Sequence, residues 1–260
     1  MSIRKVFSEA NSQSIGGTGR AGYQRPGVSM ALPRFVFPEI MDRLPADDPR
    51  AMWIRKDLSF INRLIPNSRI IAETLTERLS HPPRLLMDIG CGSGTCMLDV
   101  ARRLSPQWRG VTVVLLDQQD LISQETRAAF AELGWTAEPV AADVFDYFRN
   151  GPPRTDAVVA NLFLHHFESD RLGPLFGQIA ESTSLAIACE PRRTKLSLRI
   201  GQMAWLIGFG DLTCHDVAAS VWAGFKGREL SDLWAKNGRW QTDEYHSWPF
   251  THCFVAQRAS

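Results

Sequence analysis

From residue 83 onward the sequence alternates between short apolar runs and amphipathic stretches of helical length. Continuous apolar runs are typical of parallel strands buried on both faces, and such strands need helical crossovers between them. The pattern therefore predicts an α/β fold with a mostly parallel sheet covered by helices. A turn near Pro249 predicts an antiparallel last strand. The expected strands are residues 84–90, 111–117, 138–145, 156–167 and 184–191, with a closing pair at 240–250 and 251–258.

The segments outside this alternation predict the domain organisation. Residues 38–82 have helical spacing, with a start at Pro49 behind two aspartates, and we expect them to form a helical cap. Residues 83–260 form the main domain, within which 192–226 interrupt the rhythm as an apolar insert after the fifth strand. Residues 1–37 contain too few large apolar residues to bury, and we expect a disordered N-terminal extension.

Composition narrows the classes of function. The net charge is +1, which gives no general attraction to nucleic acid or membrane surfaces. No apolar run is long enough to span a bilayer. The five cysteines are odd in number and show no CxxC, which predicts a reduced cytoplasmic protein without disulfides or structural zinc.

A glycine-rich loop follows the first expected strand, with Gly90, Gly92 and Gly94 behind Asp88. A dinucleotide-binding loop has the pattern GxGxxG, but Thr95 stands at the third glycine position. Asp88 would also repel a diphosphate, whereas it would attract a cationic ligand. These two features disfavour a nicotinamide-dependent oxidoreductase, although a tight turn without a ligand remains an alternative reading.

The segment "MDIGCGSG" resembles the first motif of class I S-adenosylmethionine-dependent methyltransferases. The resemblance continues in order along the chain, because Asp117 ends the second strand, Asp143-Val144 follow the third, and "ANLFLHHF" resembles the ubiquinone/menaquinone-biosynthesis branch. It implies a Rossmann-like seven-stranded sheet, S-adenosylmethionine as cofactor and S-adenosylhomocysteine as product. In this resemblance the cofactor contacts Asp88, Gly90, Cys91, Gly92, Gly94, Asp117, Gln118, Asp143, Val144, Asn161 and Leu162.

Three histidines are candidates for catalysis. A phenolic acceptor has a pKa near 10 and would gain from a general base, for which neutral histidine is suited. His165 and His166 lie at the end of the fourth strand, on opposite faces if the strand continues, and His215 lies in the insert. Glu190 could orient a histidine, hold an acceptor hydroxyl or pair with a nearby arginine. No metal is expected.

The apolar insert 192–226 predicts a lid over the acceptor. Its aromatic residues Trp205, Phe209 and Trp222, together with Glu190, are the expected substrate contacts. The alternative is a helix packed on the sheet edge or in the seam of a homodimer. An apolar lid favours a small hydrophobic aromatic acceptor over nucleic acid, which would need a basic groove.

Two further segments, "DRLPADDPRAMWIRKDLSFINRL" and "PFTHCFVAQR", resemble methyltransferases found beside bacterial type III polyketide synthases. This similarity implies a phenol, quinol or pyrone-like metabolite as acceptor. The sequence thus predicts methyl transfer to a hydroxyl of such a compound. Two alternatives are methylation at carbon of a related ring and a non-catalytic protein that binds S-adenosylmethionine.

Overall fold

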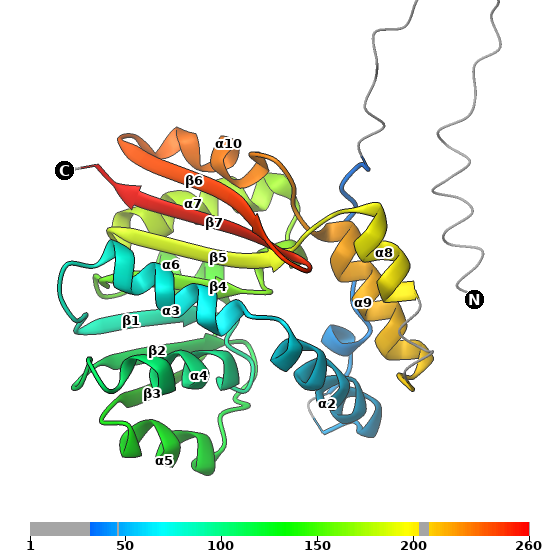
Figure 1. The fold of residues 1–260 in the computed structure, drawn as a ribbon, viewed down its shortest axis with the longest axis horizontal. Coiled ribbons are helices and arrows are strands. Elements are labelled where there is room, and N and C mark those ends of the chain that lie inside the picture. Colours follow the sequence, from blue (N-terminus) through cyan, green and yellow to red (C-terminus); the bar gives the residue numbers. More distant parts are fainter. Residues whose placement is uncertain (1–31, 46, 203–207, 260) are drawn as a thin grey trace, which may run out of the picture. The chain divides into compact units, whose positions relative to one another are not determined.

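A computed structural model describes residues 32–45, 47–202 and 208–259 of the chain. Within these residues a seven-stranded sheet has the order β3-β2-β1-β4-β5-β7-β6 (Figure 1). Strands β1 to β5 are parallel and the last strand, β7, is antiparallel, as the sequence predicts. Strand β7 lies between β5 and β6. The strands are β1 (Leu85–Ile89), β2 (Thr112–Asp117), β3 (Thr136–Ala141), β4 (Ala157–Asn161), β5 (Leu185–Pro191), β6 (Trp240–Ser247) and β7 (Thr251–Arg258).

Helices cover both faces of the sheet because each central strand is apolar on both sides. In β2, Val113 and Leu115 enter one core cluster with α3, α4 and α5, whereas Val114 and Leu116 enter another with α6, α7 and α10. The helices are α2 (Pro49–Leu64), α3 (Asn67–Arg78), α4 (Thr95–Leu104), α5 (Gln124–Glu132), α6 (Val144–Arg149), α7 (Ser169–Ser182), α8 (Lys195–Gln202), α9 (Asp211–Ala223) and α10 (Glu229–Trp234). Short 3-10 turns are η1 (Met41–Arg43), η2 (Leu164–His166) and η4 (Ala235–Asn237).

The predicted cap, residues 38–82, divides into two parts. Helix α2 starts as expected, with Pro49 in its first turn and the Asp48 carboxylate accepting from the Arg50 amide at 2.8 Å. Helix α3 instead packs on the sheet, where Ile71 and Leu75 are fully buried in the core. Figure 1 shows α2, α8 and α9 beyond the ends of the strands and α3 across the sheet.

Two strands end earlier than the sequence predicts. Strand β3 stops at Ala141 because the side chain of Asp143 accepts from two backbone amides and starts helix α6. Strand β4 stops at Asn161, and the chain then turns into η2. His165 and His166 therefore lie in a 3-10 turn, and the expectation of a continuing strand with alternating faces is wrong.

Residues 34–37 belong to the folded domain, although the sequence placed them in the extension. The Arg34 side chain donates to the carbonyl oxygens of Ala223 at 2.7 Å and Phe167 at 2.8 Å. The Phe35 amide donates to the Trp222 carbonyl. Residues 1–31 of the predicted extension lie outside the described residues. Among the described residues, no helix has both the length and the apolar character of a membrane span.

Candidate functional site

A cleft of about 1370 Å³ opens at the carboxyl ends of the parallel strands. Loops after β1, β2, β4 and β5 form one wall, and residues of α2, α8 and α9 form the other. In open α/β sheets this edge is where ligands bind. The cleft is also large enough for a cofactor and an acceptor together.

The glycine loop lies in the wall of the cleft. Its backbone is fixed by the Gly90 amide, which donates to the Leu116 carbonyl at 2.8 Å, and by the Gly92 amide, which donates to Asp117 Oδ2 at 2.9 Å. Gly90, Gly92 and Gly94 all have positive φ, which glycine adopts without strain. The loop therefore needs its glycines for its own conformation, and at Gly92 it also presents bare backbone to the cleft.

Asp88 is a buried acid at the base of this loop. Its side chain is 2% exposed, and Oδ1 has no hydrogen-bond partner among the described residues. Burial, with a smaller contribution from the Asp117 charge, raises the pKa of Asp88 from 3.8 to about 8. A cationic group in the cleft would stabilise the ionised form of this carboxyl.

Asp117 ends β2 and also lines the cleft. Its second oxygen, Oδ1, accepts from the Gln119 amide at 3.0 Å, so the carboxylate holds the backbone on both sides. The Gln118 side-chain amide donates to Asp143 Oδ2 at 3.0 Å, while Asp143 Oδ1 caps helix α6.

Nine of the eleven predicted cofactor residues line the cleft, and two do not. Those on the cleft are Asp88, Gly90, Cys91, Gly92, Asp117, Gln118, Val144, Asn161 and Leu162. Asp143 is outside the lining and acts as a helix cap. Gly94 is outside it too; its φ of 72° favours glycine, and a Cβ there would lie 3.0 Å from Ile122 Cδ1.

Asn161 and Leu162 lie where β4 turns away from the sheet. Leu162 has a φ of 54°, in the left-handed region that a branched apolar residue rarely adopts. Asn161 Oδ1 accepts from Asn67 Nδ2 at 2.7 Å, and Asn67 Oδ1 accepts from the Thr251 hydroxyl at 2.7 Å. Residues from α3 and β7 thus fix the orientation of the Asn161 side chain.

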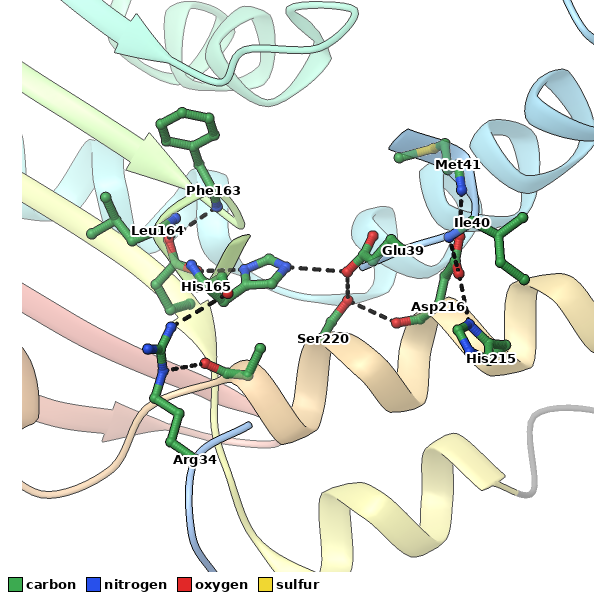
Figure 2. A network of polar contacts seen from close by, with 12 residues as sticks. Arg34, Glu39, Ile40, Met41, Phe163, Leu164, His165, His215, Asp216 and Ser220 are labelled. Atoms are coloured by element: carbon green, nitrogen blue, oxygen red, sulfur yellow. Dashed lines mark hydrogen bonds and ion pairs between the residues drawn. The ribbon is translucent and has the colours of Figure 1, made fainter. Parts of the chain in front are cut away.

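A chain of buried polar side chains forms the opposite end of the site (Figure 2). Glu190 accepts from the Phe163 amide at 3.0 Å and the Leu164 amide at 2.8 Å, and its Oε2 lies 2.7 Å from His165 Nδ1. On the other side, His165 Nε2 lies 3.4 Å from Glu39 Oε1. The Ser220 hydroxyl donates to the same glutamate and lies within hydrogen-bond distance of the Asp216 carbonyl.

This arrangement gives His165 little capacity to act as a base. Burial opposes its protonation, but the hydrogen bonds to Glu190 and Glu39 outweigh burial and raise the pKa to about 9. Both ring nitrogens face carboxylates. His166 is half-buried, lines the cleft, and has its ring 4.3 Å from that of His165. Glu190 contacts His165, in agreement with the expectation that it could orient a histidine, and it also holds the η2 turn, which the sequence did not predict.

The predicted residues of the insert have different positions. Phe209 lines the cleft, and Trp205 lies outside the described residues. Trp222 is outside the lining and packs against Phe35, with ring centroids 5.9 Å apart. His215 is also outside it, with Nδ1 3.0 Å from Asp216 Oδ1, and that carboxylate accepts from the Ile40 and Met41 amides. The Asp216 carboxylate thus holds the backbone of residues 40–41 against α9.

Glu39, Asn67 and Ser220 line the cleft, and sequence reasoning missed all three. Their identity as site residues depends on tertiary contacts between distant segments. The spacing in "PEIMDRL" predicts only a helix, and Glu39 looks there like an ordinary surface acid. In the structure Glu39 is 4% exposed, and so buried a glutamate usually has a partner. Its burial, which marks it as a site residue, can be seen only in the folded structure.

Comparisons with known proteins agree with this architecture. Residues 86–184 match the model of a family described as a methyltransferase domain, which is less than half of the chain. No curated protein matches the sequence significantly. The structure of the plantazolicin methyltransferase BpumL, in complex with S-adenosylhomocysteine, superposes with a TM-score of 0.59 at 14% identity. That match covers 82% of this chain and 92% of BpumL.

Two other similar structures are longer than this chain. An O-methyltransferase family protein from Burkholderia thailandensis has a TM-score of 0.57 at 19% identity, with 83% of this chain and 61% of that protein covered. The pyocyanin biosynthetic protein PhzM has a TM-score of 0.55 at 18% identity, with coverages of 82% and 60%. The chain thus spans about three fifths of these two proteins, and it shares with all three the Rossmann-like fold of methyltransferases.

Proposed function

We propose that this chain is an S-adenosylmethionine-dependent methyltransferase that acts on a hydroxyl of a small hydrophobic aromatic metabolite. The observation that carries the proposal is Asp88, a buried carboxyl with an unpartnered oxygen beneath a glycine loop in the wall of a large cleft. S-adenosylmethionine carries an ammonium and a sulfonium, and it supplies an electrophilic methyl group. A cationic cofactor fits this acid, whereas the diphosphate of a dinucleotide does not.

The residues that would hold the cofactor lie along one wall. Asp117 ends β2 and Gln118 follows it, and we assign both to the ribose hydroxyls and Val144 to an apolar contact with the adenine. Asn161 is pre-oriented through Asn67, which reduces the entropy lost on binding. Bare backbone at Gly92 allows close approach of the ligand.

The acceptor would occupy the part of the cleft lined by α2, α8 and α9. The side chains of Leu58, Ile61 and Ile200 give this part its apolar character, and Phe209 supplies an aromatic surface. The Glu39, His165 and His166 corner provides the polar groups at this end. His166 is the imidazole there that we assign as general base for a phenolic hydroxyl.

Calorimetric titration with S-adenosylmethionine and S-adenosylhomocysteine, with NADH as control, tests the cofactor. We expect micromolar binding of the first two and none of NADH. Transfer of a labelled methyl group to a panel of phenols, quinols and pyrones then tests the acceptor class. A folded protein that binds neither adenosyl compound would contradict the proposal.

Asp117→Ala is expected to weaken S-adenosylmethionine binding by roughly 1–3 kcal/mol, because hydrogen bonds to a charged group are lost. Asp156→Ala is a matched control. Asp156 Oδ2 also accepts from two backbone amides, those of Arg84 and Leu85, but it does so at the amino end of β1, outside the cleft lining. Calorimetry should show lower affinity for the first variant alone. Equal affinities would remove Asp117 from the cofactor site.

A further inference from the structure

We infer that Glu39, His165 and His166 form a binding site for one divalent metal ion of the zinc class. Each residue offers one ligand atom, and the three atoms all lie within 4.8 Å of one another. All three residues line the cleft. The sequence predicts no metal, since its cysteines show no CxxC spacing, and Glu39 lies far along the chain from the two histidines.

The separation of the buried pair is long for a charge-assisted hydrogen bond and matches that of two ligands on one ion. His165 Nε2 lies 3.4 Å from Glu39 Oε1, whereas a charge-assisted hydrogen bond is about 2.7–2.9 Å long. Two ligands on a tetrahedral zinc, each about 2.0–2.1 Å from the ion, are about 3.3–3.4 Å apart. Another buried pair in this chain, His252 Nε2 and Glu244 Oε1, is 2.7 Å apart and shows the usual hydrogen-bonded length.

The surroundings of the three residues resemble the outer shell of a metal site. Metal-binding histidines usually donate their other ring N–H to a carboxylate or carbonyl, which fixes the tautomer. His165 Nδ1 lies 2.7 Å from Glu190 Oε2, and with a proton on Nδ1, displacement of the Nε2 proton by a metal ion would leave a lone pair directed toward Glu39. The Glu39 carboxylate is in turn fixed by the Ser220 hydroxyl.

The two buried carboxylates are also suited to a cation. Glu39 is 4% exposed and Glu190 is fully buried, so two carboxylates flank one imidazole away from water. The nearby Arg34 guanidinium donates to the backbone carbonyl oxygens of His165 and Phe167, where it offsets part of this negative charge. A bound divalent ion would replace the proton between His165 and Glu39 and would satisfy the ligand atoms at once.

Three protein ligands leave a tetrahedral ion with an open position, as in catalytic zinc sites. His166 lies at the cleft wall, so the open position suits a water or an oxygen atom of a ligand in the cleft. The following consequence rests on the proposed function. With the ion bound, His166 would be a ligand, and the ion rather than the imidazole would lower the pKa of the acceptor hydroxyl, whose proton would pass to water.

Cobalt is the appropriate probe, because Co²⁺ occupies zinc-type sites and its visible absorption reports coordination by nitrogen and oxygen. The full chain, stripped with chelator, is titrated with Co²⁺ and then with competing Zn²⁺. We expect one equivalent to bind, with at least tenfold weaker binding in Glu39→Gln and in His166→Ala. Glu39→Gln preserves the shape of the buried side chain, and His166 is half-buried, so folding is checked by circular dichroism in both.

His81→Ala is the control for adventitious binding, because it removes an exposed histidine far from the cleft lining. It should bind cobalt like the unmodified chain. Absence of binding, or binding that neither site variant weakens, would overturn the metal site. The cobalt titration contains no S-adenosylmethionine, and the S-adenosylmethionine titration can be made on metal-free protein. Failure of the metal site can therefore be distinguished from failure of the proposed function.

Discussion

Asp88→Asn should make the ligand-free protein more stable and should weaken S-adenosylmethionine binding at least about tenfold. The carboxyl is buried beside Asp117 with one unpartnered oxygen, so its ionisation is unfavourable in the folded chain. Replacing it by a neutral amide removes that cost, which the shift of the pKa from 3.8 to about 8 puts at up to about 5 kcal/mol near pH 8. The same replacement removes the negative charge that would pair with the cationic cofactor, a contact worth about 1.5–3 kcal/mol.

The ionisation of Asp88 sets the direction in which the free energy of unfolding changes with pH. The pKa of Asp88 rises from 3.8 in the unfolded chain to about 8 in the folded chain. Below both values the group is protonated in both states and contributes nothing. Between them the unfolded chain binds fewer protons than the folded chain, so this group lowers the free energy of unfolding as the pH rises. Above about pH 8 the full destabilisation is present.

Urea unfolding of both proteins between about pH 4 and about pH 8 measures this effect as a growing difference in stability. Asp99→Asn is the control, since Asp99 also lines the cleft but is 40% exposed and paired with Arg102. We expect little change in stability or affinity for that variant. If the Asp88→Asn protein is no more stable than the original at the upper pH, other groups in the folded chain already stabilise the ionised Asp88 carboxylate.

Alanine at Gly90 and alanine at Gly92 should have different effects, although both glycines have positive φ. A Cβ at Gly90 would lie 2.0 Å from Phe163 Cδ2 and 2.8 Å from Phe163 Cβ. Rotation of the ring cannot relieve the second contact, so we expect a loss of about 3 kcal/mol or more in unfolding free energy. A Cβ at Gly92 would meet nothing within 4 Å, and we expect a loss of about 1–2 kcal/mol from the left-handed backbone alone.

The Gly92 variant should show its main effect in ligand binding. Gly92→Ala should fold, yet it should bind S-adenosylmethionine more weakly, because the added methyl group occupies space in the cleft wall. Unfolding in urea and calorimetry measure the two effects. Adding Phe163→Ala to the Gly90 variant should restore part of its stability. Equal destabilisation by both alanines would show that the approach of Phe163 does not control the loop.

The part of the site that local sequence determines could be predicted. Asp88, Gly90 and Gly92 stand at one strand end, and the alternation of strands and helices brings that end to the edge where Asp117 also lies. Motif spacing does not distinguish a ligand contact from a structural role, however. Asp143 matches the motif yet caps helix α6, and Gly94 matches it yet lies against Ile122.

The acceptor side depends on contacts that no local pattern contains. "LFLHHF" looks like the continuation of a strand. The buried Glu190 carboxylate, however, accepts hydrogen bonds from the backbone amides of residues 163–165, and the chain turns into η2 there. Glu39 reaches His165 only because the Asp216 carboxylate holds the amides of Ile40 and Met41 against α9. Both effects are pairings between residues far apart in the chain, and periodicity carries no information about them.

The position of β7 between β5 and β6 has a consequence for the order in which the protein can assemble on the ribosome. The strands β1 to β5 emerge first, and the edge of β5 stays unpaired until residues 251–258 have left the exit tunnel. Thr251, the first residue of β7, holds Asn67, which in turn orients Asn161 in the cleft. A nascent chain that has completed its glycine loop therefore still lacks part of its ligand site, and we expect S-adenosylmethionine to bind only after translation of the last strand.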